Sequence, residues 1–138
     1  MKKVFFIAAI MALSTIVAMS QSHTEIIKNK IKSQTISEVD YENSNGKETL
    51  EQVEKYNQKG NLIEFIEYDS KGKVKKHEKY EYNENNEITK EVHIDGAGKV
   101  EKTIEYKYNP KSLKTEKITY DAANRKLKVK KYIYEYYQ

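Results

Sequence analysis

Hydrophobic and polar residues alternate with a period of two over most of the chain after residue 47. In residues 99–108, the even positions carry Val, Ile, Tyr and one Lys, whereas the odd positions carry Lys, Glu and Thr. Such alternation is typical of half-buried β-strands, because successive side chains point to opposite faces of a sheet. The pattern predicts a sheet with one face rich in Tyr, Ile and Val and the other rich in Lys, Glu and Thr.

A repeat of 26 residues organises this alternation. One series with this spacing is Tyr56, Tyr82, Tyr108 and Tyr134; a second is Tyr80, Tyr106 and Tyr132; a third is Tyr68, Ile94 and Tyr120. A period of this length indicates a supersecondary unit that is stacked on copies of itself. Because each unit holds two apolar anchors, we expect it to contain two strands and two turns.

A turn signal follows each anchor. Asp or Asn stands first and Gly, Asn or Ser stands fourth in 57–60, 69–72, 83–86, 95–98, 109–112 and 121–124, and 43–46 has the same form. A first-position Asp or Asn caps a type I turn, and Gly or Asn at the fourth position accepts a left-handed backbone. We therefore expect tight hairpins with positive φ at Gly60 and Gly72. Residues that flank a turn, such as Tyr68 and Val74, should share a face.

The predicted fold class is all-β, an up-and-down antiparallel β-meander of about eight strands. The expected strands lie near 31–41, 47–56, 61–68, 73–82, 87–94, 99–108, 113–120 and 126–136. An open twisted sheet is favoured over the alternative, a closed small barrel. Closure would turn Lys76, Glu78, Lys90, Lys102 and Lys128 inward, and burying unpaired charges is costly. The apolar face of an open sheet needs a cover, for which residues 21–30, a second copy or a partner protein are candidates.

Three segments are less clearly defined. Residues 21–40 form an N-terminal segment in which 21–30 have no assignment. Lys47–Tyr56 has the propensity of a short helix as well as of a strand, and the strand keeps the 26-residue register. Arg125–Lys131 shifts the face pattern by one residue, which predicts a wider bulge there.

The N-terminus has the form of an export signal. Lys2 and Lys3 precede an apolar run, and Ala18-Met19-Ser20 is a small-x-small cleavage site, so residues 1–20 read as a signal peptide cleaved before Gln21. A membrane anchor is the alternative, for which the run is short. We expect residues 41–138 to form the repeat domain of an exported protein, periplasmic or extracellular, with no membrane attachment after cleavage.

The amino-acid composition excludes several classes of function. The chain holds 25 basic and 21 acidic residues, and removal of the signal leaves a nearly balanced mixture, which does not resemble a nucleic-acid-binding footprint. The absence of Cys excludes a disulfide framework, a thiol nucleophile and Cys-ligated zinc. Because Leu and Phe are scarce beyond the signal, the twelve Tyr residues must supply much of the packing.

Residues 56–83, YNQKGNLIEFIEYDSKGKVKKHEKYEYN, resemble the tyrosine–aspartate (YD, or RHS-type) repeats of bacterial exported proteins. The chain is also similar to small exported bacterial proteins of unknown function that carry a few such units behind a signal peptide. The resemblance covers about residues 41–136 and implies a β-meander. Large members of the group form shells around a toxin domain, which this chain lacks, so that role does not carry over. Carbohydrate binding is a looser implication of the same resemblance.

Candidate catalytic groups are few. His77 and His93 are expected to face solvent on the charged side, without the spacing of a zinc site. Glu64 and Glu78 fall on neighbouring predicted strands of one face, as a glycosidase pair would, but a regular meander offers no cleft. No nucleophile elbow, P-loop or dinucleotide fingerprint is present. We therefore expect a non-enzymatic protein without cofactor or metal.

The tyrosine ladder is the one candidate ligand site. It comprises Tyr80, Tyr82, Tyr106, Tyr108, Tyr132 and Tyr134. A row of rings can stack on sugars or on bases, but cross-strand Tyr pairs also stabilise sheets by about 0.2–1 kcal/mol each. The sequence favours a structural role for the central rings. Function is then expected to be that of a binding or scaffold module for an unknown protein or glycan, with self-association through the apolar face, or alternatively that of a small ligand-carrying barrel.

Overall fold

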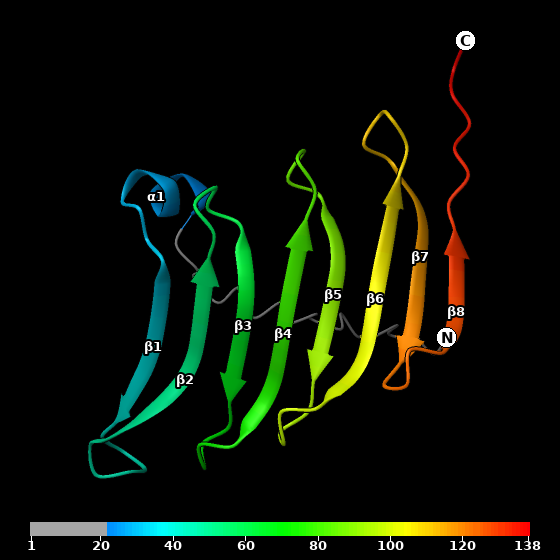
Figure 1. Cartoon of the computed structure of the whole chain (residues 1–138). Coiled ribbons are helices and arrows are strands. Elements are labelled where there is room, and N and C mark those ends of the chain that lie inside the picture. Colours follow the sequence, from blue (N-terminus) through cyan, green and yellow to red (C-terminus); the bar gives the residue numbers. More distant parts are fainter. Residues whose placement is uncertain (1–21) are drawn as a thin grey trace, which may run out of the picture.

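The computed structural model describes residues 22–138, which form one open sheet of eight antiparallel strands in sequence order with one short helix (Figure 1). The helix is α1 (His23–Lys28); the strands are β1 (Ser33–Asp40), β2 (Lys47–Tyr56), β3 (Leu62–Tyr68), β4 (Val74–Tyr82), β5 (Ile88–Ile94), β6 (Val100–Tyr108), β7 (Lys114–Asp121) and β8 (Lys126–Lys131). The predicted all-β meander is confirmed, and so is the open sheet: β1 and β8 lie at opposite edges and do not pair. The predicted signal peptide, residues 1–20, lies outside the described residues.

The predicted strand boundaries agree with the structure within about two residues, with one exception. Lys47–Tyr56 forms strand β2, so the short helix considered for this segment is excluded. The last strand was expected to reach residue 136, but β8 ends at Lys131. The reason is that β7, its one neighbour in residues 22–138, begins at Lys114, two residues before the last pair of Glu116 with Lys131, so little of β7 remains for the chain beyond β8 to pair with. Beyond Lys131, a single backbone hydrogen bond, from Tyr132 N–H to the Thr115 carbonyl (2.9 Å), continues the ladder.

Helix α1 occupies the N-terminal segment that the sequence left unassigned. Ser22 and Glu25 form a reciprocal capping box at its start, which satisfies backbone N–H groups that a helix otherwise leaves unpaired. Ile26 is the most deeply buried apolar side chain of the described residues and lies at the end of β2, beside Tyr56 and the β2–β3 turn. The helix lies at one corner of the sheet (Figure 1), so among the described residues it does not cover the remaining strands.

The six repeated turns form as predicted. Gly60 and Gly72 have φ of +76° and +75°, and the Asn and Ser residues at the same turn position are also left-handed, with Asn86 at 62° and Ser112 at 61°. At the first position, the Asp69 side chain accepts backbone hydrogen bonds from Lys71 and Lys73 (both 2.9 Å). These contacts fix each turn from its own residues, which explains why turn sequence alone identified them.

The connection between β1 and β2 differs from the predicted turn. The last strand pair is Asp40 with Lys47, and the Asp40 carboxylate accepts hydrogen bonds from the backbone N–H groups of Glu42 and Asn43. Asp40 therefore takes the capping role that was expected of Asn43. The loop is longer than the repeated turns, and Gly46 still has the expected positive φ (75°).

Gly60 and Gly72 provide a matched test of this geometry. We expect Gly72→Ala to lower the free energy of unfolding by about 1–2 kcal/mol, because it places a Cβ atom in the left-handed region with open space around it. Gly60→Ala should cost more, because its Cβ would also lie 2.7 Å from Cγ1 of Ile27. Urea unfolding of both variants, with Lys71→Ala as a control, measures the difference. Equal losses for the two glycines would contradict the packing of α1 on this turn.

Each hairpin also contains a second irregularity, which the sequence analysis did not predict. Glu67 pairs with Lys76 while the next residue, Tyr68, pairs with Val74, so Lys75 is an extra residue in β4. The other hairpins of the repeat hold an extra residue at the equivalent place: Ile63, Thr89, Glu101, Thr115 and Leu127. An extra residue inverts the in–out alternation of the strand that carries it.

The bulges overturn the predicted division into an apolar and a charged face. Val100 pairs with Ile94 before the bulge of β6, whereas Ile104 pairs with Glu91 after it, so Val100 and Ile104 lie on opposite faces. Strict alternation along the sequence, without a bulge, predicts that these two residues share a face. The wider bulge expected in Arg125–Lys131 is also wrong, because β8 carries the same single extra residue as the other hairpins.

Both faces therefore mix apolar and charged side chains. What we call the tyrosine face carries the series Tyr56, Tyr80, Tyr82, Tyr106, Tyr108, Tyr132 and Tyr134, with Glu78, Glu91, His93 and Ile104 among them. The second face carries Tyr68, Ile94, Tyr120, Val74, Val92 and Ile118, with Glu64, His77, Lys79 and Glu105. Partners in an antiparallel ladder share a face, which is what assigns these residues.

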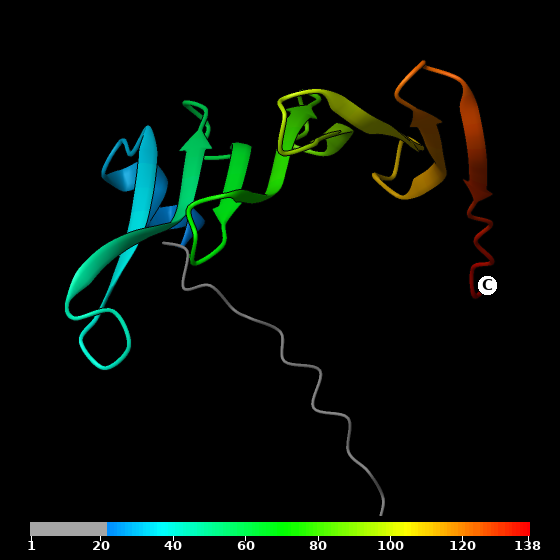
Figure 2. The ribbon, with the colours of Figure 1, turned by 90° about the horizontal axis from the view of Figure 1, so that it is seen from below.

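The sheet is a single twisted layer and has little apolar core (Figure 2). Four hydrophobic residues are buried among the described residues, namely Ile26, Tyr56, Ile104 and Ile118, and four polar residues are equally buried, namely Gln52, Glu54, Asn61 and Glu78. A sheet with so little apolar burial must depend on its ladders, its turns and the hydrogen bonds between side chains on each face. Those side-chain contacts define the candidate sites.

Candidate functional site

The six candidate tyrosines come together on the tyrosine face. Two project from β4, two from β6 and two from the residues that follow β8, at equivalent positions of three successive units. Tyr80, Tyr82, Tyr106 and Tyr108 are partly buried, whereas Tyr132 and Tyr134 are 36% and 39% exposed. The exposure of the ladder thus rises towards its C-terminal end.

Three of these hydroxyl groups fasten one strand to the one before it. Tyr82, Tyr108 and Tyr134 donate hydrogen bonds to backbone carbonyl groups 20 residues earlier, those of Leu62, Ile88 and Lys114 (2.6, 2.7 and 2.7 Å). The bond recurs because the 26-residue repeat returns the same hydroxyl to the same carbonyl. This recurring hydrogen bond explains structurally why Tyr82, Tyr108 and Tyr134 are spaced by 26 residues.

The two central tyrosines of the ladder, Tyr80 and Tyr106, have hydrogen-bond or cation–π partners within the protein. Tyr80 donates a hydrogen bond to Glu78, and Tyr106 donates one to Glu91 (2.8 Å). Burial, reinforced by these carboxylates, raises the pKa of both tyrosines, so the hydroxyl groups remain protonated donors. The Nζ atoms of Lys114 and Lys117 lie 4.0 and 5.6 Å from the centroid of the Tyr106 ring, as in a cation–π contact.

A cluster on the same face was missed by sequence reasoning. Glu78 is buried and accepts from Tyr80, and it lies 2.9 Å from Lys76 Nζ and 3.1 Å from His93 Nδ1. His93 Nε2 lies 3.5 Å from a Glu91 oxygen, without a hydrogen bond, so the imidazole lies between two carboxylates and contacts Glu78 more closely. Burial raises the pKa of Glu78, but the hydrogen bonds from Tyr80 and Lys76 outweigh it and hold the pKa below its usual value.

Glu64 and Glu78 do not form the carboxylate pair that was considered. They lie on adjacent strands, but Glu64 is on the second face and Glu78 on the tyrosine face, because Glu64 pairs with Lys79 and Phe65 with Glu78. The placement of both histidines was also wrong: His77 and His93 lie on opposite faces, and each is partly buried beside a glutamate. His77 Nε2 lies 2.8 Å from Glu64.

The charge partners of Glu64 predict an acid-dependent loss of stability. Burial raises its pKa, but hydrogen bonds with Lys55 (2.6 Å) and His77 lower it to about 2, from an ordinary 4.5. A depressed pKa means that the unfolded chain binds the proton first, so the stabilisation is present above pH 4.5 and is lost as the pH falls towards 2. Glu64→Gln should reduce the change in the free energy of unfolding between pH 4.5 and pH 2 by about 1–3 kcal/mol. Urea unfolding between pH 2 and 6 measures it, and an unchanged pH profile would contradict the assigned contacts.

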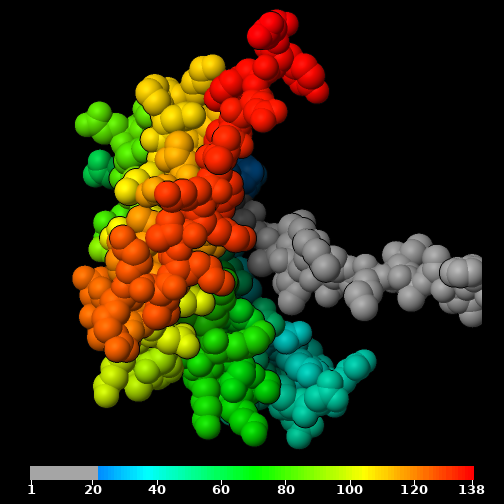
Figure 3. All heavy atoms as spheres, turned by 90° about the vertical axis from the view of Figure 1, so that its right-hand side faces the viewer, coloured from blue at the N-terminus to red at the C-terminus, as the bar shows by residue number. Residues whose placement is uncertain are grey.

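The second candidate surface is the outer edge of the sheet at β8. All six residues of β8 are exposed, and within residues 22–138 the strand pairs with β7 alone. The apolar Leu127 is 63% exposed, and Ile133 and Tyr137, which follow the strand, are 91% and 106% exposed. Figure 3 views the molecule from this side and shows β8 and the C-terminal residues in front of the remaining strands.

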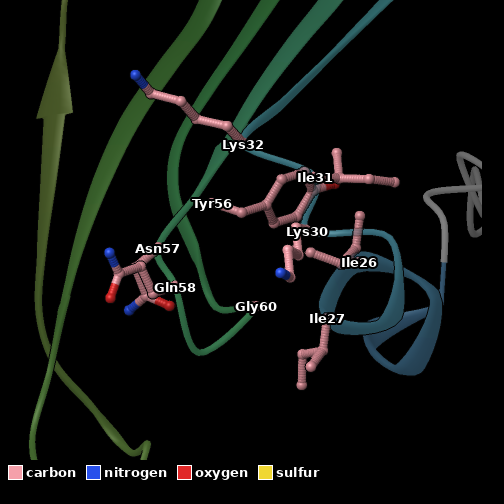
Figure 4. Close-up of a pocket in the computed structure, with 9 residues that line it drawn as sticks. All are labelled: Ile26, Ile27, Lys30, Ile31, Lys32, Tyr56, Asn57, Gln58 and Gly60. Carbon is pink, nitrogen blue, oxygen red and sulfur yellow. The ribbon is translucent and has the colours of Figure 1, made fainter.

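A groove forms the third candidate surface, at the corner that holds α1 (Figure 4). It has a volume of about 730 Å³ and lies between α1 with the residues that follow it and the β2–β3 turn. Ile26, Ile27, Ile31 and Tyr56 supply an apolar lining, and Lys30 contributes a cationic group. Sequence reasoning missed this groove because residues 21–30 had no structural assignment.

Comparison with known proteins yields no match: no protein-family model and no curated protein is similar to the chain. Among the described residues, no three His, Asp or Glu side chains are arranged to hold a metal ion. No helix in residues 22–138 is long and apolar enough to cross a membrane.

Proposed function

We propose that the protein is an exported, non-enzymatic binding or scaffold module that engages a protein partner by strand addition at β8. The observation that carries the proposal is the unpaired edge of β8, which presents backbone donors and acceptors beside exposed apolar side chains. A peptide that adds a strand to such an edge gains main-chain hydrogen bonds, and the alternating side chains provide selectivity. The four lysines of β8 favour an acidic partner strand.

A protein partner is supported over a glycan by the state of the tyrosine ladder. Sugar stacking requires a free ring face, but at the centre of the ladder the Nζ atom of Lys114 lies 4.0 Å from the Tyr106 ring centroid. Outside the ladder, Lys111 Nζ lies 4.1 Å from the Tyr136 ring centroid. The alternative of a small ligand-carrying barrel lacks its structural basis, since the sheet is open. Export follows from the signal-peptide hypothesis and belongs to the same proposal.

Binding of short peptides tests the proposal. A fluorescent peptide with alternating acidic and β-branched residues should bind saturably and protect the β8 amides from hydrogen exchange. A peptide of the same length with lysine in place of the acidic residues serves as the control and should bind at least about tenfold more weakly. Saturable binding of an oligosaccharide on a glycan array, without peptide binding, would overturn the proposal in favour of a glycan partner.

A further inference from the structure

The geometry points to a specific occupant of the β8 edge: strand β1 of a second copy of this chain. We propose that copies join head to tail, with β1 of one copy extending the sheet of the next. This inference rests on the proposed function, because it identifies the partner strand that the β8 edge binds. Its basis is the placement of the two outer strands and the chemistry of their side chains.

The sheet topology makes such a junction continuous. Strands alternate in direction across an even number of strands, so β1 and β8 run in opposite directions (Figure 1). A copy placed beside β8 in the same orientation therefore offers β1 antiparallel to β8. β1 also has the form of the shorter strand of the repeat: Asp40 caps the connection that follows it, as Asp69, Asp95 and Asp121 do after β3, β5 and β7.

The internal register gives the expected pairing. In the β6–β7 pair, Lys102 is opposite Asp121, and Lys128 is the repeat equivalent of Lys102. Asp40 is the equivalent of Asp121 by its capping role. Carrying the register across the junction places six residues of β8 and its extension opposite β1 of the second copy. The pairs are Lys128 with Asp40, Val129 with Val39, Lys130 with Glu38, Lys131 with Ser37, Tyr132 with Ile36 and Ile133 with Thr35.

These pairs are complementary in charge and in face. Two lysines meet two carboxylates, and Val129 and Tyr132 meet apolar side chains. Ile36 pairs with Gln52, which shares a face of β2 with Glu54, and this is the tyrosine face. Ile36 therefore lies on the same side of the sheet as Tyr132. Pairing of β8 with a second β8 would instead oppose lysine with lysine, which edge strands use to prevent association.

The junction would also bring the C-terminal residues to the α1 groove. Past Tyr134 the chain runs alongside the residues that precede Ser33 in the second copy, which include Lys30 and Ile31 of the groove lining. Tyr136 and Tyr137 are 57% and 106% exposed in the single chain and would pack their rings on the apolar lining of the groove. Because the contact joins two different surfaces, it produces an open chain of copies unless the twist closes a ring.

Charge exchange between the two edges tests the proposal on the full chain. Lys130→Glu and Glu38→Lys should each weaken association at least about tenfold in sedimentation velocity at low salt, because each sets like charges opposite one another. An equimolar mixture of the two variants, or the double variant, should restore association. Lys130 neighbours Lys117 in the sheet, so Lys130→Glu relieves a like-charge pair and should not impair folding. Lys71→Glu, in an exposed turn, makes the same charge change away from both edges and should have no effect.

The outcomes separate this inference from the proposed function. A chain that stays monomeric at every concentration yet binds the acidic peptide at β8 overturns the head-to-tail junction and leaves the strand-addition function standing. A monomer that binds no peptide overturns both. Association that Lys130→Glu strengthens and Glu38→Lys leaves unchanged would show pairing of β8 with β8, and association that neither variant alters would place the interface elsewhere; both results contradict the proposal.

Discussion

Replacing Tyr106 with alanine is expected to lower the free energy of unfolding by about 2–4 kcal/mol, somewhat less than a fully buried aromatic residue would lose. The ring is partly buried at the centre of the tyrosine face, its hydroxyl donates to Glu91, and two lysines lie over it. With only four apolar residues buried in the described chain, this sheet has few other contacts to compensate. Urea unfolding followed by circular dichroism measures the change.

Two companion variants make the Tyr106 result specific. Tyr137→Ala removes the same side chain from a fully exposed position and should leave stability within about 0.5 kcal/mol of the parent. Tyr106→Phe retains the ring and removes one hydrogen bond, at a cost of about 0.5–1.5 kcal/mol. If Tyr106→Ala melted like the parent and lost binding to a glycan or peptide, the ring would be a ligand platform and its structural role would be refuted.

The second large effect is expected at Glu78. The residue is 5% exposed and its carboxylate contacts Tyr80, Lys76 and His93, so Glu78→Ala deprives three groups of their acceptor. A buried donor without an acceptor costs about 1–3 kcal/mol, and we expect a total loss of about 2–3 kcal/mol in thermal or urea unfolding.

Glu81 provides the control for Glu78 on the same strand. Its side chain is 64% exposed and lies 3.4 Å from Lys90, so Glu81→Ala should change stability by no more than about 0.5 kcal/mol. Glu78→Gln keeps the shape and some of the hydrogen bonds and should fall between the two. Equal effects of the two alanine substitutions would mean that the cluster around Glu78 adds nothing beyond a surface ion pair.

The parts of the fold that could be predicted are those that depend on local chemistry. Turns were identified because Asp69 and Gly72 each satisfy a requirement of the same four-residue segment, and the repeat multiplied that signal. The faces could not be assigned, because the extra residue in each hairpin, such as Lys75, arises from pairing between strands and leaves no mark in residue type. A one-residue error of that kind inverts every later side chain of the strand.

The candidate sites were predictable to a similar extent. The 26-residue spacing brought the six tyrosines together, since equivalent positions in a repeat fall on one face. The contacts of His93 with Glu78 and Glu91 were not predicted, because they depend on which residues the bulges place side by side. The last strand was expected to be longer, reaching residue 136, and the exposure of the β8 edge results from the absence, within the described residues, of a ninth strand.

Each strand of this sheet pairs with its neighbours in the sequence, and this has a consequence for how such a chain can evolve. A duplicated or deleted 26-residue unit adds or removes two strands and two bulges together. The next strand therefore runs in the same direction as before, and its side chains lie on the same faces of the sheet. The two outer strands would keep their direction and their facing side chains. The hydrogen bonds of the tyrosine hydroxyl groups would still span 20 residues. Half a unit would reverse the strand at the edge. The number of units is thus free to vary by recombination, whereas the unit itself is indivisible.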